Sequence, residues 1–183
     1  GRSAGVSISA SNPEGEQRVI ISLDRQILDW FGGHGEHLSW PVSTALNGPG
    51  EAQDSGCTPR GRHYVRAMVG WGKPEGTVFV ARRPTGETWS PELSRHYPQR
   101  DWILSRIIWL CGLENGFNRG PGVDSFRRFI YIHGTPDTEP MGKPRSHGCI
   151  RMRNRDVIEL FDRLVAGTPV IIEPGPRPVN QEQ

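Results

Sequence analysis

The chain has 183 residues, of which 34% are apolar and 23% are charged, and its formal net charge is +2 at pH 7. This is enough material for one domain with a packed core and too little for two full domains. The small, dispersed charge argues against nucleic-acid binding, because no basic run is interleaved with aromatic residues. The 16 prolines and 23 glycines favour turns and short strands, so we expect a mainly β fold.

The cysteine count and the hydropathy pattern restrict the setting of the protein. Cys57, Cys111 and Cys149 cannot all pair within one chain, so at least one thiol is free. No stretch approaches the roughly twenty apolar residues that span a bilayer, and we expect no transmembrane segment. Because the chain begins at Gly1 rather than Met, removal of a leader stays open and the sequence does not fix the compartment.

The first part of the chain predicts a loose lead-in followed by a series of strands. Residues 1–16 are small and polar with no periodicity, which is typical of a segment without regular structure. Two β-prone runs separated by Asp24 and Arg25 then predict a hairpin. The predicted strands of this half cover residues 19–23, 26–31, 38–45, 62–69, 77–81 and 87–89.

The second half predicts two helices and two strands. Apolar residues at 103, 107 and 110 share one helical face, so residues 101–112 predict a helix capped by Asp101 and ended by Gly112. Residues 129–133 predict a strand. Helical spacing then predicts a second helix at about 154–166, with Asn154 as its cap. A last strand at 169–172 leads into a polar, proline-rich tail at 175–183.

A histidine and a cysteine in the second half form a candidate catalytic pair. His133 ends the strand at 129–133, and Cys149 follows sixteen positions later in a glycine-containing turn. A cysteine attacks as the thiolate and needs a base, which His133 would supply. Gly148 removes a side chain where a carbonyl must approach, and the N–H groups of Gly148 and Cys149 could stabilise an oxyanion. The turn is therefore suited to acyl transfer.

Two other interpretations of these residues stay open. Zinc could be held by His133, His147 and Cys149 together with Cys57 or His63, although no Cys-x-x-Cys or His-Glu-x-x-His pair is present. We expect neither a metal nor another cofactor. Alternatively, the histidine and the cysteine are both structural, because cysteine is common in cores and histidine is often merely hydrogen-bonded.

The motif residues resemble a known family. His133-Gly134 followed by Ser146-His-Gly-Cys-Ile-Arg-Met152 is similar to the signature of the L,D-transpeptidase catalytic domain, also called the YkuD domain. The likeness extends to Gln26, Val42-Ser-Thr44, Thr58-Pro-Arg-Gly61 and Gly167-Thr-Pro-Val170. It implies a mainly β, sandwich- or barrel-like fold with a capping helix, to which the apolar spacing adds the two helices at about 101–112 and 154–166. The catalytic domain would span residues 17–174, with an insertion at about 91–122 that could cover the cleft.

The resemblance also implies a role for each motif residue. Cys149 matches the nucleophile and His133 the general base, while Gly134 matches the position whose carbonyl orients the imidazole. Hydrogen bonding to substrate and oxyanion stabilisation are expected of the rest of the motif, namely Ser146, His147, Gly148 and Arg151.

The reaction implied is that of a cysteine-dependent L,D-transpeptidase acting on peptidoglycan tetrapeptide stems through a thioester acyl-enzyme, with release of the terminal D-alanine. Its partners would be stem peptides or muropeptides, and carbapenems should acylate Cys149. L,D-carboxypeptidase action or D-amino-acid exchange are alternatives, as is a non-catalytic peptidoglycan-binding module. The resemblance implies the bacterial cell envelope or periplasm, with cytoplasmic action on recycled muropeptides as the alternative.

Overall fold

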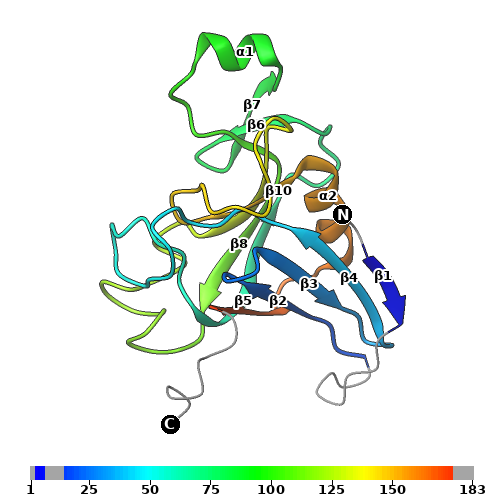
Figure 1. The fold of residues 1–183 in the computed structure, drawn as a ribbon, viewed down its shortest axis with the longest axis vertical. Coiled ribbons are helices and arrows are strands. Elements are labelled where there is room, and N and C mark those ends of the chain that lie inside the picture. Colours follow the sequence, from blue (N-terminus) through cyan, green and yellow to red (C-terminus); the bar gives the residue numbers. More distant parts are fainter. Residues whose placement is uncertain (1–2, 7–14, 175–183) are drawn as a thin grey trace.

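A computed structural model describes residues 3–6 and 15–174, where eleven strands form one curled sheet accompanied by two helices (Figure 1). The strands are β1 (Ser3–Val6), β2 (Arg18–Ser22), β3 (Ile27–Phe31), β4 (Glu36–Pro41), β5 (Gly61–Val69), β6 (Thr77–Val80), β7 (Arg83–Thr88), β8 (Ile103–Gly112), β9 (Tyr131–Thr135), β10 (Ile150–Arg153) and β11 (Pro169–Glu173). The helices are α1 (Pro91–His96) and α2 (Asn154–Arg163). The strand order is β1-β4-β3-β2-β11-β5-β8-β6-β7, and β9 joins β8 and carries β10.

The first strands confirm the predicted hairpin. β2 and β3 pair in antiparallel register with Ser22 opposite Ile27, and β4 pairs with the other side of β3, so the three strands form a meander. β11 closes this half by lying parallel to β2 and antiparallel to β5. The predicted lead-in is wrong for residues 3–6, which form β1 beside β4, while residues 7–14 and the predicted tail at 175–183 lie outside the described residues.

The predicted helix at 101–112 is wrong, because this segment is strand β8. It pairs with β5, β6 and β9, and a β-bulge interrupts its pairing with β9 between Leu104 and Ile107. A strand covered on both faces has a nearly continuous run of apolar residues. The bulge also shifts the alternation of side chains between the two faces of β8. The helical spacing of residues 103, 107 and 110 therefore arose by coincidence. This segment, assigned by sequence to an insertion at about 91–122, therefore contributes a strand inside the sheet.

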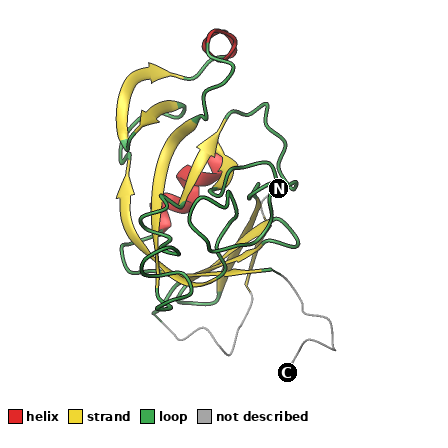
Figure 2. Cartoon of the chain, turned by 90° about the vertical axis from the view of Figure 1, so that its left-hand side faces the viewer, coloured by secondary structure: helices red, strands yellow, loops and turns green. Residues whose placement is uncertain are grey.

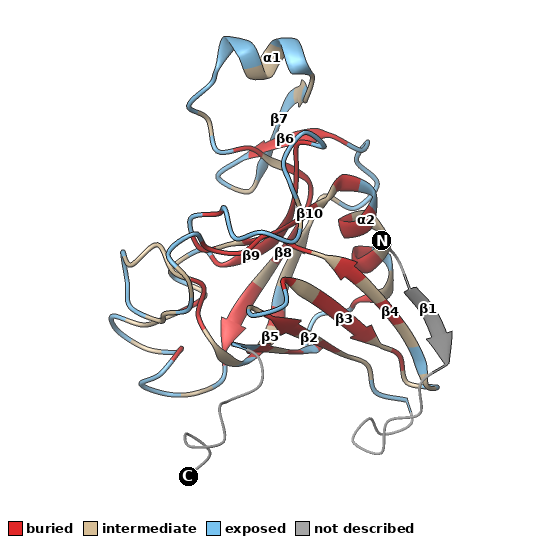
Figure 3. Ribbon diagram, viewed as in Figure 1, coloured by how far each residue is buried: buried red, intermediate tan, exposed pale blue. Residues whose placement is uncertain are grey.

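The main core lies where the curled sheet and α2 enclose a common space. It contains buried residues of the sheet and of α2, including Trp40, Ile132, Met152 and Leu160. Figure 3 shows buried segments of the strands and of α2 facing this space. Figure 2 shows α2 within the curve of the strands, whereas α1 and the β6–β7 hairpin project from one end of the molecule (Figures 1 and 2). No helix among the described residues has the length and apolar character needed to cross a membrane.

The predicted second helix is confirmed as α2, although it ends at Arg163 rather than near 166. Its N-cap residue is Arg153, which makes no side-chain cap hydrogen bond. Asn154, the predicted cap, instead accepts a hydrogen bond from the Ser105 hydroxyl at 2.6 Å and donates to the Thr135 carbonyl at 3.0 Å. Its side chain therefore ties the start of the helix to β8 and β9.

A buried histidine on β5 gives the fold a pH-dependent stability. His63 is fully buried, with Nδ1 3.0 Å from the Gly61 carbonyl and Nε2 2.8 Å from Ser125 Oγ. Burial lowers the pKa of His63 to about 4. The unfolded chain thus binds more protons than the folded chain between about pH 6.5 and 4, and folding is destabilised as the pH falls through that range.

We expect the free energy of unfolding to fall by up to about 3 kcal/mol between pH 7 and pH 4 because of His63, which is protonated more readily in the unfolded chain. Urea unfolding of the wild type and of His63→Gln at both pH values would measure the loss. The variant should lack this part of the acid destabilisation, and equal losses in the two proteins would contradict the assignment to His63.

Candidate active site

The strands β9 and β10 bring the predicted catalytic pair to one face of the sheet. They run parallel, with Ile132 opposite Ile150 and His133 opposite Arg151. Side chains alternate along a strand, so His133 shares its face with Tyr131, and Arg151 shares its face with Cys149. Ile132 and Ile150 point the other way into the main core. Cys149 and His133 therefore lie diagonally across neighbouring strands on the face away from that core.

The Cys149 sulfur is held by the backbone at the start of β9. It accepts a hydrogen bond from the Tyr131 N–H at 3.4 Å and donates to the Phe129 carbonyl at 3.3 Å. The side chain packs against a small apolar cluster that includes Phe79, Ile107 and Tyr131. Burial raises the pKa of the Cys149 thiol to about 12, while the Tyr131 N–H opposes this shift. The resting thiol is therefore neutral and would need a base to act as a nucleophile.

His133 is buried and held in one orientation. Its Nδ1 lies 2.6 Å from the Gly134 carbonyl, so Nδ1 carries the proton and Nε2 is left as the basic nitrogen. Burial lowers the pKa of His133, with the Gly134 carbonyl acting in the opposite direction. The imidazole is thus neutral at neutral pH, which is the state that can accept a thiol proton.

Gly134 is required by close packing as well as by its carbonyl. A Cβ at this position would lie 2.5 Å from the Leu104 carbonyl oxygen and 2.5 Å from Asn154 Oδ1. Asn154 and Ser105, linked by their hydrogen bond, press on this strand from the other side. The same contacts therefore fix the carbonyl that orients His133.

The turn that carries Cys149 is held by Ser146. Ser146 Oγ donates to the Cys149 carbonyl at 2.6 Å and accepts from the Gly148 N–H at 3.2 Å. The Gly148 N–H, one of the two predicted oxyanion donors, is therefore bonded to Ser146. The other predicted donor, the Cys149 N–H, is not bonded to this serine. Gly148 has φ +135°, and a Cβ there would lie 3.2 Å from the Cys57 carbonyl, so the turn needs glycine.

The segment after β4 lines the other side of this turn. Ser43 pairs with Arg151, and Ala45 bridges to Ser146. Gln26 fixes the segment, because its side-chain oxygen accepts from the Thr44 N–H at 2.9 Å and its amide donates to Thr44 Oγ1 at 2.6 Å. Gln26 and residues 42–44, which belong to the family likeness, therefore support the cysteine turn.

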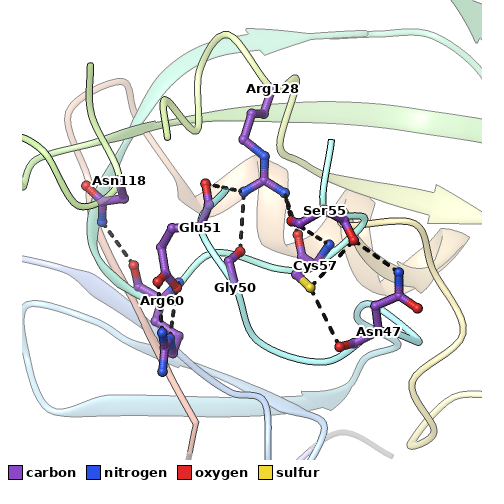
Figure 4. A network of polar contacts seen from close by, with 8 residues as sticks. All are labelled: Asn47, Gly50, Glu51, Ser55, Cys57, Arg60, Asn118 and Arg128. Carbon is purple, nitrogen blue, oxygen red and sulfur yellow. Dashed lines mark hydrogen bonds and ion pairs between the residues drawn. The ribbon is translucent and has the colours of Figure 1, made fainter. Parts of the chain in front are cut away.

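The loop at residues 47–60 is held by a network of polar contacts (Figure 4). The Arg128 guanidinium donates to the carbonyls of Gly50, Glu51 and Cys57, the last at 2.7 Å. Arg60 and Glu51 form a two-pronged ion pair within the loop. From this loop Thr58 Oγ1 donates to the Gly148 carbonyl at 2.8 Å, so the fixed loop also fixes the turn.

The remaining motif residues lie at the edge of the pair. Arg151 is largely buried, and its guanidinium forms an ion pair with Asp101 at 3.2 Å and reaches the Arg145 carbonyl at 3.4 Å. Arg151 disfavours a charged His133, whereas Asp101 favours it. His147 is exposed on the turn, two positions before Cys149. The structure therefore places Ser146, Gly148 and Cys149 in one turn, and His133, Gly134 and Arg151 on the paired strands β9 and β10.

Several supporting residues were not predicted. Tyr131 could have been found, because it lies two positions before His133 and so shares its face. Asp101 and Asn154 come from distant parts of the chain, and the sequence assigned both to helix caps. Thr58 belongs to the family likeness, but its hydrogen bond to the Gly148 carbonyl could not be read from the sequence. Within the described residues, no three histidine, cysteine, aspartate or glutamate side chains cluster closely enough to hold a metal ion.

A family model described as the L,D-transpeptidase catalytic domain matches residues 16–172 of the chain. In sequence, the chain is 33% identical over 96 residues to the probable L,D-transpeptidase YbiS of Escherichia coli strain K12. That match covers 51% of this chain and 30% of the relative, so the chain spans well under two thirds of the relative's length.

Solved structures share the fold at low sequence identity. An L,D-transpeptidase from Mycobacterium smegmatis has a TM-score of 0.53 and 16% identity, over 86% of this chain and 58% of that one. L,D-transpeptidase 3 from Mycobacterium tuberculosis, in complex with a faropenem-derived adduct, has a TM-score of 0.51 and 14% identity, over 86% and 60% of the two chains. The curled sheet with its helices is therefore the fold of these proteins.

Proposed function

The chain belongs to the L,D-transpeptidase catalytic domain family, and on that premise we propose that it transfers the acyl group of peptidoglycan tetrapeptide stems through a thioester on Cys149. The observation that carries the proposal is the placement of a neutral thiol and a neutral, oriented imidazole on one face of β9 and β10. The residues proposed to orient the imidazole, to bind substrate and to stabilise the oxyanion are Gly134, Ser146, His147, Gly148 and Arg151.

In the first half-reaction, Cys149 Sγ attacks the carbonyl of the third, L-centred diamino acid residue of the stem. His133 Nε2 accepts the thiol proton as the S–C bond forms, and the Cys149 N–H stabilises the oxyanion. The tetrahedral intermediate then collapses with cleavage of the C–N bond. The proton on His133 passes to the leaving amine, so D-alanine departs and the thioester remains.

In the second half-reaction, an acceptor attacks the thioester and gives its proton to His133, and the proton returns to the departing Cys149 sulfur. An amine of another stem gives a cross-link between third residues, and a free D-amino acid gives exchange. Water gives L,D-carboxypeptidase action. We propose amine transfer as the principal outcome, in the cell envelope where the polymer lies, with exchange or hydrolysis on muropeptides as the alternative.

The proposal is tested by incubating the purified protein with a tetrapeptide stem and following the products by mass spectrometry. We expect release of D-alanine, and incorporation of an added D-amino acid in place of the one lost. Meropenem should add one mass equivalent to the intact protein, as expected for a thioester-forming β-lactam target. A folded protein that releases no D-alanine and forms no adduct would instead be a non-catalytic peptidoglycan-binding module.

A further inference from the structure

An arginine at the tip of the β6–β7 hairpin lies on the same side of the sheet as the cysteine. Val80 pairs directly with Arg83, so the turn consists of Ala81 and Arg82, and both have positive φ values of 49° and 63°. Such angles are unfavourable for residues other than glycine. The turn therefore holds the backbone of Arg82 in a conformation that is unfavourable for arginine.

The Arg82 guanidinium rests on an aromatic platform. Its Cζ lies 5.1 Å from the centre of the Trp109 ring and 5.0 Å from that of Phe129. Nη1 donates to the Tyr131 hydroxyl at 3.1 Å, and burial raises the pKa of that phenol. Trp109 packs edge-on against Tyr131. The aromatic platform therefore consists of Trp109, Phe129 and Tyr131 in contact with one another.

The platform adjoins the sulfur directly. Phe129 and Tyr131 are the residues whose backbone carbonyl and N–H bind Cys149 Sγ. Arg82 is thus one tyrosine side chain away from the nucleophile. Among the described residues, no carboxylate forms an ion pair with Arg82, and its side-chain hydrogen bond to Tyr131 uses one of its five N–H donors.

We propose that Arg82 binds a carboxylate of the stem peptide next to the scissile bond and thereby selects the acyl donor; this inference rests on the proposed function. An arginine whose plane is fixed by aromatic rings presents its N–H edge to a carboxylate with little loss of freedom. Two carboxylates lie near the scissile carbonyl: the terminal one of D-alanine and the side-chain one of a dicarboxylic diamino acid. Both share the chemistry that the guanidinium recognises.

Three donor peptides separate the sources. One is a tetrapeptide whose third residue carries a side-chain carboxylate, the second ends in D-alaninamide, and the third has lysine at the third position. For Arg82→Gln we expect kcat/KM on the first peptide to fall about ten- to hundred-fold, mainly through KM. The defect should disappear on whichever peptide lacks the recognised carboxylate, and Arg82→Lys should recover part of the loss.

The matched control is Arg83→Gln, which removes the same charge from the adjacent, exposed position and should leave all three rates unchanged. The rate of Cys149 alkylation by neutral iodoacetamide checks that the site is intact in each variant. An equal loss on all three peptides would show that Arg82 only supports the platform and would overturn the inference. A wild type that releases nothing from any peptide would overturn the proposed function itself.

Discussion

Replacement of Cys149 by alanine is expected to abolish D-alanine release and to remove the meropenem adduct from the intact-protein mass spectrum. The sulfur is the only atom of the proposed pair that bonds to the substrate carbonyl, so its loss removes the covalent path entirely. A reduction of about 10⁴-fold or more in kcat/KM is expected, in line with removal of a nucleophile.

The other half-buried thiol provides the matched control. The Cys57 carbonyl accepts a hydrogen bond from Arg128, and its thiol points to the carbonyls of Asn47 and Ser55 (Figure 4). Cys57→Ser should therefore keep the adduct and most of the activity. An adduct that survives in Cys149→Ala and disappears in Cys57→Ser would place the nucleophile in the loop and contradict the proposed mechanism.

The placement of the two proposed catalytic residues could be predicted only in part from sequence. The residue types, the strand before His133 and the glycine before Cys149 all indicated a thiol and its base. Their approach depends on the parallel pairing of β9 with β10, which joins strands separated by a loop and sets His133 opposite Arg151. Local patterns carry no information about such a register, so residue types and family resemblance predicted the pair without predicting this strand pairing.

The largest error in the fold also has a physical cause. β8 lies between β5 and β9 and is buried on both faces from Leu104 to Leu110, apart from Trp109. Polar residues in it mark a bulge, because Ser105 has φ 72° and bonds to Asn154. A strand buried on both faces with a displaced alternation cannot be told from a buried helix by periodicity.

The supporting residues were the least predictable part of the site. Asn154 has the sequence position of a helix cap, but its amide serves the strand that carries His133. Arg82 is one of many arginines in the sequence, and only the tight hairpin turn places it against Trp109 and Tyr131. Both roles are set by tertiary contacts between segments far apart in the chain, which no local pattern encodes.

Replacement of His133 by glutamine is expected to reduce acylation by meropenem about 10²- to 10⁴-fold at neutral pH and to change its pH dependence. In the wild type, the pKa of His133 is lowered and that of Cys149 is raised to about 12. His133 is therefore already neutral at about pH 6.5, the ordinary pKa of histidine. The Cys149 thiol stays protonated throughout the neutral range. The wild-type rate should rise on an acid limb below about pH 6.5 and then stay flat through the neutral range.

Without the base, the variant can react only through the small thiolate fraction, which grows about tenfold per pH unit below the thiol pKa. Its acylation rate, followed by intact-protein mass spectrometry between pH 6 and 9, should therefore climb steadily where the wild-type rate is flat. His34→Gln, an exposed histidine in the turn between β3 and β4, is the control and should keep the wild-type profile. Parallel profiles for His133→Gln and the wild type would contradict proton transfer to His133, because a thiolate formed without the imidazole would then carry the reaction in both proteins.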